Sequence, residues 1–156
     1  MRVGLGVDAH AFDASRPLVL GGIEISSSPG LAGHSDADVL SHAIADALLG
    51  AAGLSDLGTM FPHDERWRDS SSLDILAATA RALSEAGWSV ANIDATLLAE
   101  APKVAAYRAQ MIAAVSSALG VDEDVVWIKA TTTDGLGFVG RTEGMAALAV
   151  ALVRRD

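Results

Sequence analysis

The sequence contains no cysteine, few aromatic residues and few cations. Aromatic side chains make up 4% of the 156 residues, and 11 lysines and arginines are outnumbered by 20 aspartates and glutamates. The missing cysteines exclude disulfides and thiolate metal sites, so any metal ion must be held by histidines and carboxylates. The formal net charge of −9 argues against a nucleic-acid partner, which would require clusters of lysine and arginine.

Long apolar runs are also missing. No stretch reaches the roughly 18 uninterrupted apolar residues of a membrane span, and the first residues lack a signal-peptide pattern. We therefore expect a cytoplasmic protein with no membrane partner. The length predicts one domain over residues 1–156, and the 51% of hydrophobic residues are sufficient for an ordinary core.

Strict alternation predicts a β-strand over residues 2–8. The apolar Val3, Leu5 and Val7 fall on one side. The other side carries Gly4, Gly6, Asp8 and His10. The two glycines leave space on the side where a carboxylate and an imidazole lie next to each other. A half-buried strand whose polar end frays into a loop is the alternative interpretation.

A helix is expected within residues 33–53. Ser35 is the predicted N-cap, with Asp38 in the capping-box position. Apolar residues then recur at helical spacing over residues 39–51, and Gly50 and Gly53 loosen the end of the helix.

One side of this helix carries a polar row. Asp38, His42 and Asp46 are four residues apart, which places His42 between two carboxylates. Together with Asp8 and His10, His42 supplies two nitrogens and one oxygen, a ligand set that suits zinc with an open fourth position. An ordinary solvated histidine on a helix is the alternative.

The remaining elements mix strands and helices without strict alternation, which favours an α+β fold: a mixed β-sheet with helices packed on one face, plus a small N-terminal hairpin. The expected elements are a hairpin over 18–25 around two glycines, a helix over 70–87, a strand over 90–99, a helix from Pro102 to Gly120, a strand over 124–132, and a strand over 145–153 that a short helix could replace.

The loop over residues 131–141 is rich in groups that bind phosphate. It combines three threonines, an aspartate, three glycines and an arginine, which can gather N–H and O–H donors around an anion. A threonine-rich strand end before a glycine turn is equally ordinary. Lys103, in the first turn of its predicted helix, is either a surface residue or placed to meet an anion.

Three motifs occur in the order GLGVDAHAF, HSDADVLSHAIADALLGAAGLSDLGTMFP and KATTTDGLGFVGRTEG. Over nearly the whole chain, they resemble the 2-C-methyl-D-erythritol 2,4-cyclodiphosphate synthases of non-mevalonate isoprenoid biosynthesis. The resemblance implies a CDP-linked substrate whose 2-phosphate attacks the β-phosphate, closes a cyclic diphosphate and releases CMP. It also implies a homotrimer with active sites between subunits.

The resemblance assigns roles to individual residues. Zinc would be bound by Asp8, His10 and His42, and a second ion, Mg²⁺ or Mn²⁺, would contact Asp134, where many relatives carry glutamate. His34 and Thr132 correspond to residues that stabilise the transition state. The implied substrate-binding residues are Asp8, His10, His34, Ser35, Asp56, Gly58, Phe61, Glu65, Ala99, Lys103, Ala105, Thr131, Thr132, Thr133, Asp134, Phe138 and Arg141.

Some implications have alternatives. Arg141 and Glu143 would surround a threefold axis, where relatives hold an isoprenoid diphosphate in an axial cavity, or they would form an ion-paired ring. His63 and Glu65 stand where many relatives carry aspartates. The residues alone also allow a metal-dependent phosphohydrolase or a non-catalytic trimeric protein that binds a metal or ligand.

Overall fold

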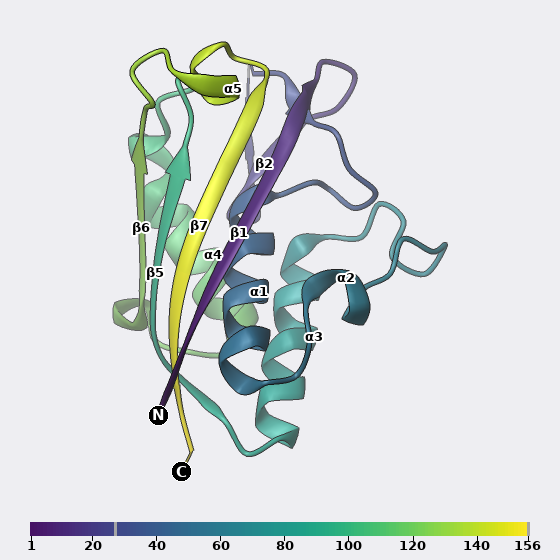
Figure 1. Cartoon of the computed structure of the whole chain (residues 1–156), viewed down its shortest axis with the longest axis vertical. Helices are drawn as coiled ribbons and strands as arrows, with labels where there is room; N and C mark the ends of the chain where they lie inside the picture. The colour runs from purple at the N-terminus through teal and green to yellow at the C-terminus, as the bar shows by residue number, and fades with distance from the viewer. Residues whose placement is uncertain (27, 156) are drawn as a thin grey trace.

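The computed structural model describes residues 1–26 and 28–155, and its centre is a five-stranded mixed sheet (Figure 1). The strand order is β4-β1-β7-β5-β6. β5 and β6 run parallel, and the other neighbouring pairs are antiparallel. The strands are β1 (Arg2–Asp13), β4 (Gly30–Leu31), β5 (Ser89–Leu98), β6 (Val126–Thr131) and β7 (Gly144–Arg154). The mixed sheet of the predicted α+β class is therefore confirmed.

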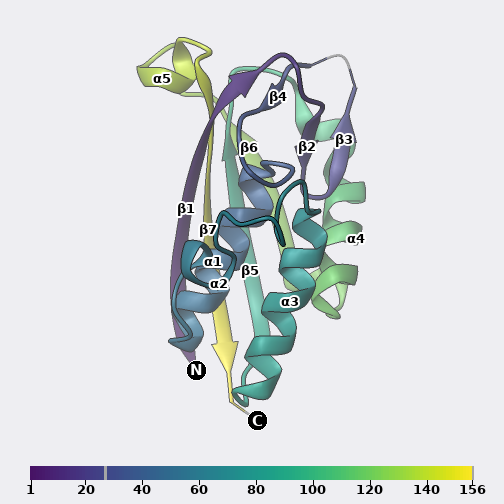
Figure 2. The ribbon, with the colours of Figure 1, turned by 90° about the vertical axis from the view of Figure 1, so that its right-hand side faces the viewer.

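The long helices cover one face of this sheet, as Figure 2 shows from the side. The long helices are α1 (Val39–Ala52), α3 (Ser72–Glu85) and α4 (Arg108–Leu119). The short ones are α2 (Leu57–Met60), α5 (Gly137–Gly140) and the 3-10 turns η1 (Val104–Tyr107) and η2 (Glu123–Val125). The short α5 lies away from the long helices, at one end of the sheet. No helix in the described part of the chain has the length and apolar character needed to cross a membrane.

A second, two-stranded sheet lies beside the first. β2 (Leu18–Leu20) and β3 (Ile23–Ile25) pair antiparallel. Gly21 and Gly22 connect them with φ values of 56° and 76°, a left-handed conformation that glycine adopts without steric cost.

The first strand lies directly against helix α1 because two of its residues have no side chain. A Cβ atom on Gly4 would lie 2.0 Å from the carbonyl oxygen of Ala47, and one on Gly6 would lie 2.0 Å from that of Ala43. The glycine side of the strand therefore faces the helix. This close contact brings the polar end of β1 next to α1.

The opposite side of the first strand is apolar and exposed. Val3, Leu5 and Val7 are 67%, 62% and 58% exposed. The neighbouring strand β7 adds exposed Leu148 and Val150, so a contiguous apolar surface lies on the face of the sheet that none of the long helices in the described residues covers. We call these five residues the open apolar face.

Two predicted helix starts are wrong. Helix α1 has Asp38 as its N-cap, and the Asp38 carboxylate accepts hydrogen bonds from the backbone N–H groups of Leu40 and Ser41. The predicted cap, Ser35, lies three residues before Asp38. The helix expected from Pro102 begins only at Arg108, because the backbone at Lys103 is still extended and a 3-10 turn follows it.

Other predicted elements are confirmed. Helix α3 is capped by Ser71, and Gly87 follows its end with φ of 74°. Strand β5 buries Ile93, Ala95 and Leu97. The C-terminal segment over 145–153 is a strand rather than a helix.

Candidate active site

Three ionisable side chains meet where β1 lies against α1. Asp8 Oδ2 lies 2.9 Å from His10 Nε2 and 3.0 Å from His42 Nδ1, and the two nitrogens are 3.3 Å apart. Within the described residues this is the one group of three or more histidine or acidic side chains whose ligand atoms converge, all within 4.8 Å of one another. We call it the Asp8–His10–His42 cluster.

The orientation of His10 is set by the chain after β4. Its Nδ1 lies 2.6 Å from the carbonyl oxygen of Ala32. A carbonyl oxygen only accepts hydrogen bonds, so Nδ1 carries the hydrogen and Nε2 faces the cluster. A backbone carbonyl behind a histidine is the usual support of a metal ligand.

The electrostatics of the cluster favour a cation. Burial by itself raises the pKa of Asp8, but hydrogen bonds from His10 and His42 and their positive charges hold that pKa well below its usual range. Burial lowers the pKa of His10, yet the bond to Asp8 and its negative charge raise it overall. Asp8 is therefore ionised at neutral pH. Two imidazole nitrogens and one carboxylate oxygen fit zinc as ligands.

A cavity of about 220 Å³ opens beside the cluster. Six of the predicted site residues line it: Asp8, His10, His34, Ser35, His42 and Phe61. The lining residues that were not predicted include two with aromatic rings, His63 and Trp67. The His63 ring stacks on His34, with centroids 5.2 Å apart and an interplanar angle of 19°. His63 could have been found because it stands where many relatives carry aspartate, whereas no feature of the sequence indicated that Trp67 lines the site.

The segment that carries His34 and Ser35 is held from both sides. The guanidinium of Arg16 donates to the carbonyl oxygens of Gly33 and Ser35. The backbone N–H of Asp69 donates to the carbonyl oxygen of His34 at 2.9 Å. His34 Nε2 is 2.7 Å from the carbonyl oxygen of Asp64, so the imidazole has a fixed direction.

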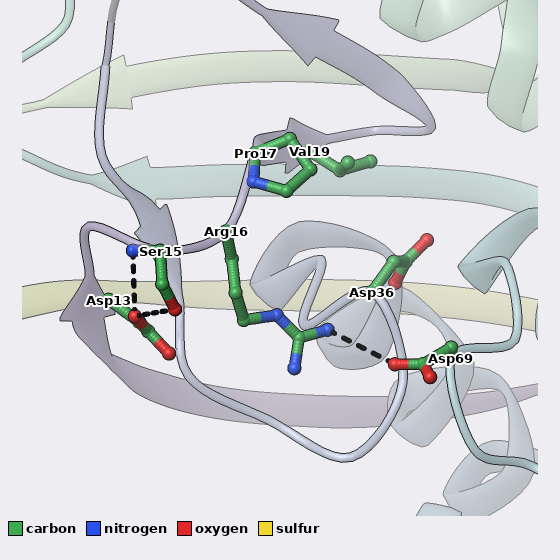
Figure 3. A pocket seen from close by; sticks show the side chains of 7 residues that line it. All are labelled: Asp13, Ser15, Arg16, Pro17, Val19, Asp36 and Asp69. Atoms are coloured by element: carbon green, nitrogen blue, oxygen red, sulfur yellow. Dashed lines mark hydrogen bonds and ion pairs between the residues drawn. The ribbon is translucent and has the colours of Figure 1, made fainter.

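A larger cavity of about 570 Å³ lies on the other side of this segment (Figure 3). Its wall includes Arg16, Asp13, Asp36 and Asp69. Figure 3 shows the Arg16 side chain reaching toward Asp69, 3.9 Å away. These carboxylates do not form a converging group as the side chains of the cluster do, and the Arg16 guanidinium donates to backbone carbonyl oxygens. The chemistry is therefore concentrated in the smaller cavity.

His42 does not have Asp38 and Asp46 as carboxylate neighbours, although helical spacing predicted both. The carboxylate of Asp38 accepts backbone N–H groups from Gly21 and Gly22 as well as from its own helix, and Asp46 accepts the N–H of Leu57. Both carboxylates bind backbone N–H groups that lack a partner within their own helix or turn. The carboxylate beside His42 is that of Asp8.

The threonine-rich loop after β6 is organised by Glu100, which was not a predicted site residue. Its carboxylate accepts the backbone N–H of Thr133 at 2.9 Å, the Thr133 hydroxyl at 3.2 Å and the backbone N–H of Gly135 at 3.4 Å. These hydrogen bonds, the one from the Thr133 N–H first, lower the pKa of Glu100. Thr132 donates its hydroxyl to Asp134 at 3.2 Å.

A third cavity, of about 150 Å³, lies beside the threonine-rich loop, where β5 and β6 end. Five predicted residues line it: Ala99, Lys103, Ala105, Thr131 and Thr132. It shares no lining residue with the cavity beside the cluster, and strands β7 and β5 lie between β1 and β6. One chain therefore gathers the predicted residues into two separate groups.

The other predicted residues lie outside both cavities. Asp56 caps α2 by accepting the N–H of Thr59 at 2.8 Å, and Gly58 belongs to that helix. Glu65 is 83% exposed and pairs with Arg68 at 2.7 Å.

The last two predicted residues lie at the C-terminal end of the threonine-rich loop. Phe138 is exposed on α5. Arg141 pairs with Glu143 at 2.8 Å, so within one chain these two side chains form the ion pair considered as an alternative.

The sequence matches the YgbB family over residues 1–154. It is 52% identical over 152 residues to the 2-C-methyl-D-erythritol 2,4-cyclodiphosphate synthase of Desulfatibacillum aliphaticivorans, with 97% of this chain and 98% of the relative covered. The synthase of Desulfosudis oleivorans is 55% identical over 154 residues, with 98% and 92% covered.

Solved structures agree with the sequence matches. A CDP-bound 2C-methyl-D-erythritol-2,4-cyclodiphosphate synthase has a TM-score of 0.89 at 33% identity, covering 98% of this chain and 100% of its own. The CDP complex of IspF from Plasmodium falciparum scores 0.86 at 30% identity, covering 99% and 96%. The bifunctional IspDF of Campylobacter jejuni scores 0.95 at 38% identity, and this chain spans 42% of its length. The chain therefore belongs to the YgbB family, and the resemblance of its three motifs to the cyclodiphosphate synthases is confirmed over nearly the whole sequence.

Proposed function

We propose that this protein converts 4-diphosphocytidyl-2-C-methyl-D-erythritol 2-phosphate to 2-C-methyl-D-erythritol 2,4-cyclodiphosphate and CMP, a phosphorus–oxygen lyase reaction of isoprenoid biosynthesis. The observation that carries the proposal is the convergence of Asp8, His10 and His42 in a chain about 50% identical to proteins named for this reaction. Two similar solved structures are CDP complexes, which agrees with a cytidine-linked substrate.

The reaction needs no nucleophilic side chain. An oxygen of the substrate's own 2-phosphate attacks the β-phosphorus, and the bond from that phosphorus to the oxygen bridging it to the α-phosphate breaks. CMP leaves with this oxygen. Proximity and electrostatic stabilisation then supply most of the rate.

The cluster would hold one Zn²⁺ on Asp8, His10 and His42. Bound zinc supplies Lewis-acid polarisation of a phosphate and fixes its position. His34 and Ser35 lie in the same cavity, with the His34 imidazole held by the Asp64 carbonyl. We assign His34 to stabilising the charge that develops on the phosphate.

The threonine-rich loop would supply the second half of the site. Thr132 would donate its hydroxyl to the transition state, and Asp134 would contact Mg²⁺ or Mn²⁺ on the diphosphate. The segment that includes Lys103 would hold the cytidine end, since it lines the same small cavity as Thr131 and Thr132. The remaining assigned substrate contacts are Asp56, Gly58, Phe61, Glu65, Ala99, Ala105, Thr133, Phe138 and Arg141.

A homotrimer would join the two groups of residues. The two cavities lie apart in one chain, and the open apolar face has no helix to cover it. Packing of this face around a threefold axis would bring the loop of one subunit to the cluster of the next, in a single-domain cytoplasmic protein over residues 1–156. Arg141 would then line an axial cavity able to take an isoprenoid diphosphate.

Phosphorus NMR tests the activity directly. We expect the protein, given the CDP-linked substrate and Mg²⁺, to produce a cyclic diphosphate and CMP without inorganic phosphate. Release of inorganic phosphate alone would support a phosphohydrolase instead, and an unchanged substrate with zinc bound would support a non-catalytic binding protein. The Asp8→Asn variant, prepared in parallel, controls for contaminating activity.

A further inference from the structure

The cluster is supported from behind by a buried pair of hydroxyls. His42 is 6% exposed. Its Nδ1 faces Asp8, and its Nε2 lies 3.1 Å from the hydroxyl oxygens of both Ser35 and Ser72. Ser72 is fully buried and comes from the first turn of α3, thirty residues further along the chain.

The hydrogen of the Ser72 hydroxyl is already committed. Ser72 Oγ donates to Asp36 Oδ1 at 2.5 Å, and the Ser72 backbone N–H donates to Asp36 Oδ2 at 2.7 Å. Asp36 also accepts the N–H of Asp38 at 3.2 Å. A backbone N–H group only donates, so both oxygens of Asp36 act as acceptors here. The carboxylate of Asp36 thus serves only as an acceptor, on the wall of the larger cavity in Figure 3.

A hydroxyl group has one hydrogen and two lone pairs. Because its hydrogen points to Asp36, Ser72 offers a lone pair to His42. The Nε2 atom of His42 must then carry a hydrogen to make this contact. Ser35 Oγ accepts the backbone N–H of Ala37 at 3.3 Å, and it too can accept from Nε2. The chain of contacts keeps the hydrogen on Nε2, so Nδ1, which faces Asp8 and His10, is the nitrogen whose lone pair a zinc ion can take up.

We propose that Ser72 and Asp36 are positioning residues for the metal site: through one buried hydroxyl, they hold the His42 ring and its tautomer so that Nδ1 binds zinc. This inference rests on the proposed zinc site. Outer contacts of this kind typically contribute a factor of about 10 to 100 in metal affinity. Ser72, thirty residues from His42 in the sequence, would thus influence how tightly the three ligands bind zinc.

The test is zinc affinity, measured by competition with a chromogenic chelator on purified protein. We expect Ser72→Ala to weaken zinc binding about 10- to 100-fold. A matched control is Ser116→Ala, because Ser116 is also a buried serine in a helix, and its hydroxyl has no hydrogen-bond partner among the described residues. The control should bind zinc as the wild type does.

A spectroscopic measurement separates positioning from general destabilisation. In ¹⁵N-histidine-labelled wild type we expect His42 to show a protonated Nε2 that exchanges slowly with water. In Ser72→Ala that exchange becomes faster, while far-UV circular dichroism stays unchanged.

The outcomes are distinguishable. If wild type binds no zinc, the proposed metal site itself fails. If wild type binds zinc and folded Ser72→Ala binds it equally tightly, the positioning role is overturned. If Ser72→Ala does not fold, the wild-type spectrum decides: an unprotonated His42 Nε2 overturns the inference, and a protonated, slowly exchanging one supports it.

Discussion

The Asp8–His10–His42 cluster and the threonine-rich loop differ in how far a single chain completes them. In the cluster, side chains from a strand and a helix contact one another directly, and each imidazole has a fixed partner behind it. In the loop, Thr132 bonds to its near neighbour Asp134, and Thr131, Asp134 and Phe138 are exposed. In the first region one chain brings all three side chains together, and the second is an exposed surface rich in hydrogen-bond donors.

This difference has a physical consequence. Binding of a metal ion offsets the free-energy cost of bringing its few ligands together and removing them from water. One chain can therefore supply the whole site. A diphosphate is larger and needs donors from several directions. In the proposed trimer, the open apolar face would bring a second chain within reach.

The largest expected effect comes from Leu5→Glu on the open apolar face. Burying a carboxylate in each copy costs several kcal/mol per chain, so the trimer should dissociate and turnover should fall to background. Each chain should still bind zinc, because the cluster is complete without a partner. Light scattering, zinc content and CMP release would be measured together, with Leu5→Val as the control. An assembled and active Leu5→Glu protein would disprove the role of this face.

Asp8→Asn should have the next largest effect. It preserves shape but removes the negative charge that both histidines contact. Loss of zinc, worth several kcal/mol of charge stabilisation, should lower turnover on the order of 10³-fold, while the trimer persists. Asp122→Asn, an exposed residue without a side-chain cap bond, is the control. Wild-type zinc content and activity would refute the ligand assignment.

Thr132→Ala should lower kcat by about 10²-fold, as is typical when one preorganised donor to a developing charge is removed. Zinc content and assembly should not change, since Thr132 is neither one of the proposed zinc ligands nor part of the open apolar face. Thr132→Ser keeps the hydroxyl and should recover most of the activity. Steady-state kinetics with both variants would distinguish this from a packing effect, in which Thr132→Ser would be as impaired as Thr132→Ala.

Asp134→Asn should have the smallest effect. Asp134 has φ of 53°, a left-handed conformation that asparagine tolerates as well as aspartate, so the backbone should not move. Losing about 1 kcal/mol of exposed charge attraction should raise the Mg²⁺ concentration for half-maximal activity about fivefold. A Mg²⁺ titration of initial rates gives the answer, and an unchanged midpoint would remove Asp134 from the metal assignment.

Much of the cluster was predictable from sequence, because alternation in residues 2–8 and helical spacing around His42 each place one ligand group. That the two groups meet was inferred from their ligand types and then supported by the family resemblance, because neither pattern alone brings the strand to the helix. The choice between Ser35 and Asp38 as N-cap was not decidable locally, since both are good capping residues. Asp38 is favoured by two further donors, Gly21 and Gly22, from a distant turn.

The parts that failed or were missed depend on tertiary contacts. Ser72 reaches His42 only because α3 packs beside α1, and no motif records that contact. Glu100 lies next to a strand end and organises a loop over thirty residues away. The sequence predicted that Val3, Leu5 and Val7 share a side, but not that the glycine side would be the one covered by helix α1.

Gly4 and Gly6 control how closely β1 approaches α1, and therefore the distances among Asp8, His10 and His42. They precede Asp8 and His10 on the same side of β1, and they allow the strand to rest against the carbonyl groups of α1. A methyl group at either position would act as a wedge and move His42 away from its two partners on the strand. Two residues without side chains thus maintain the spacing between the proposed zinc ligands, and we expect even a methyl group at either position to change metal affinity first.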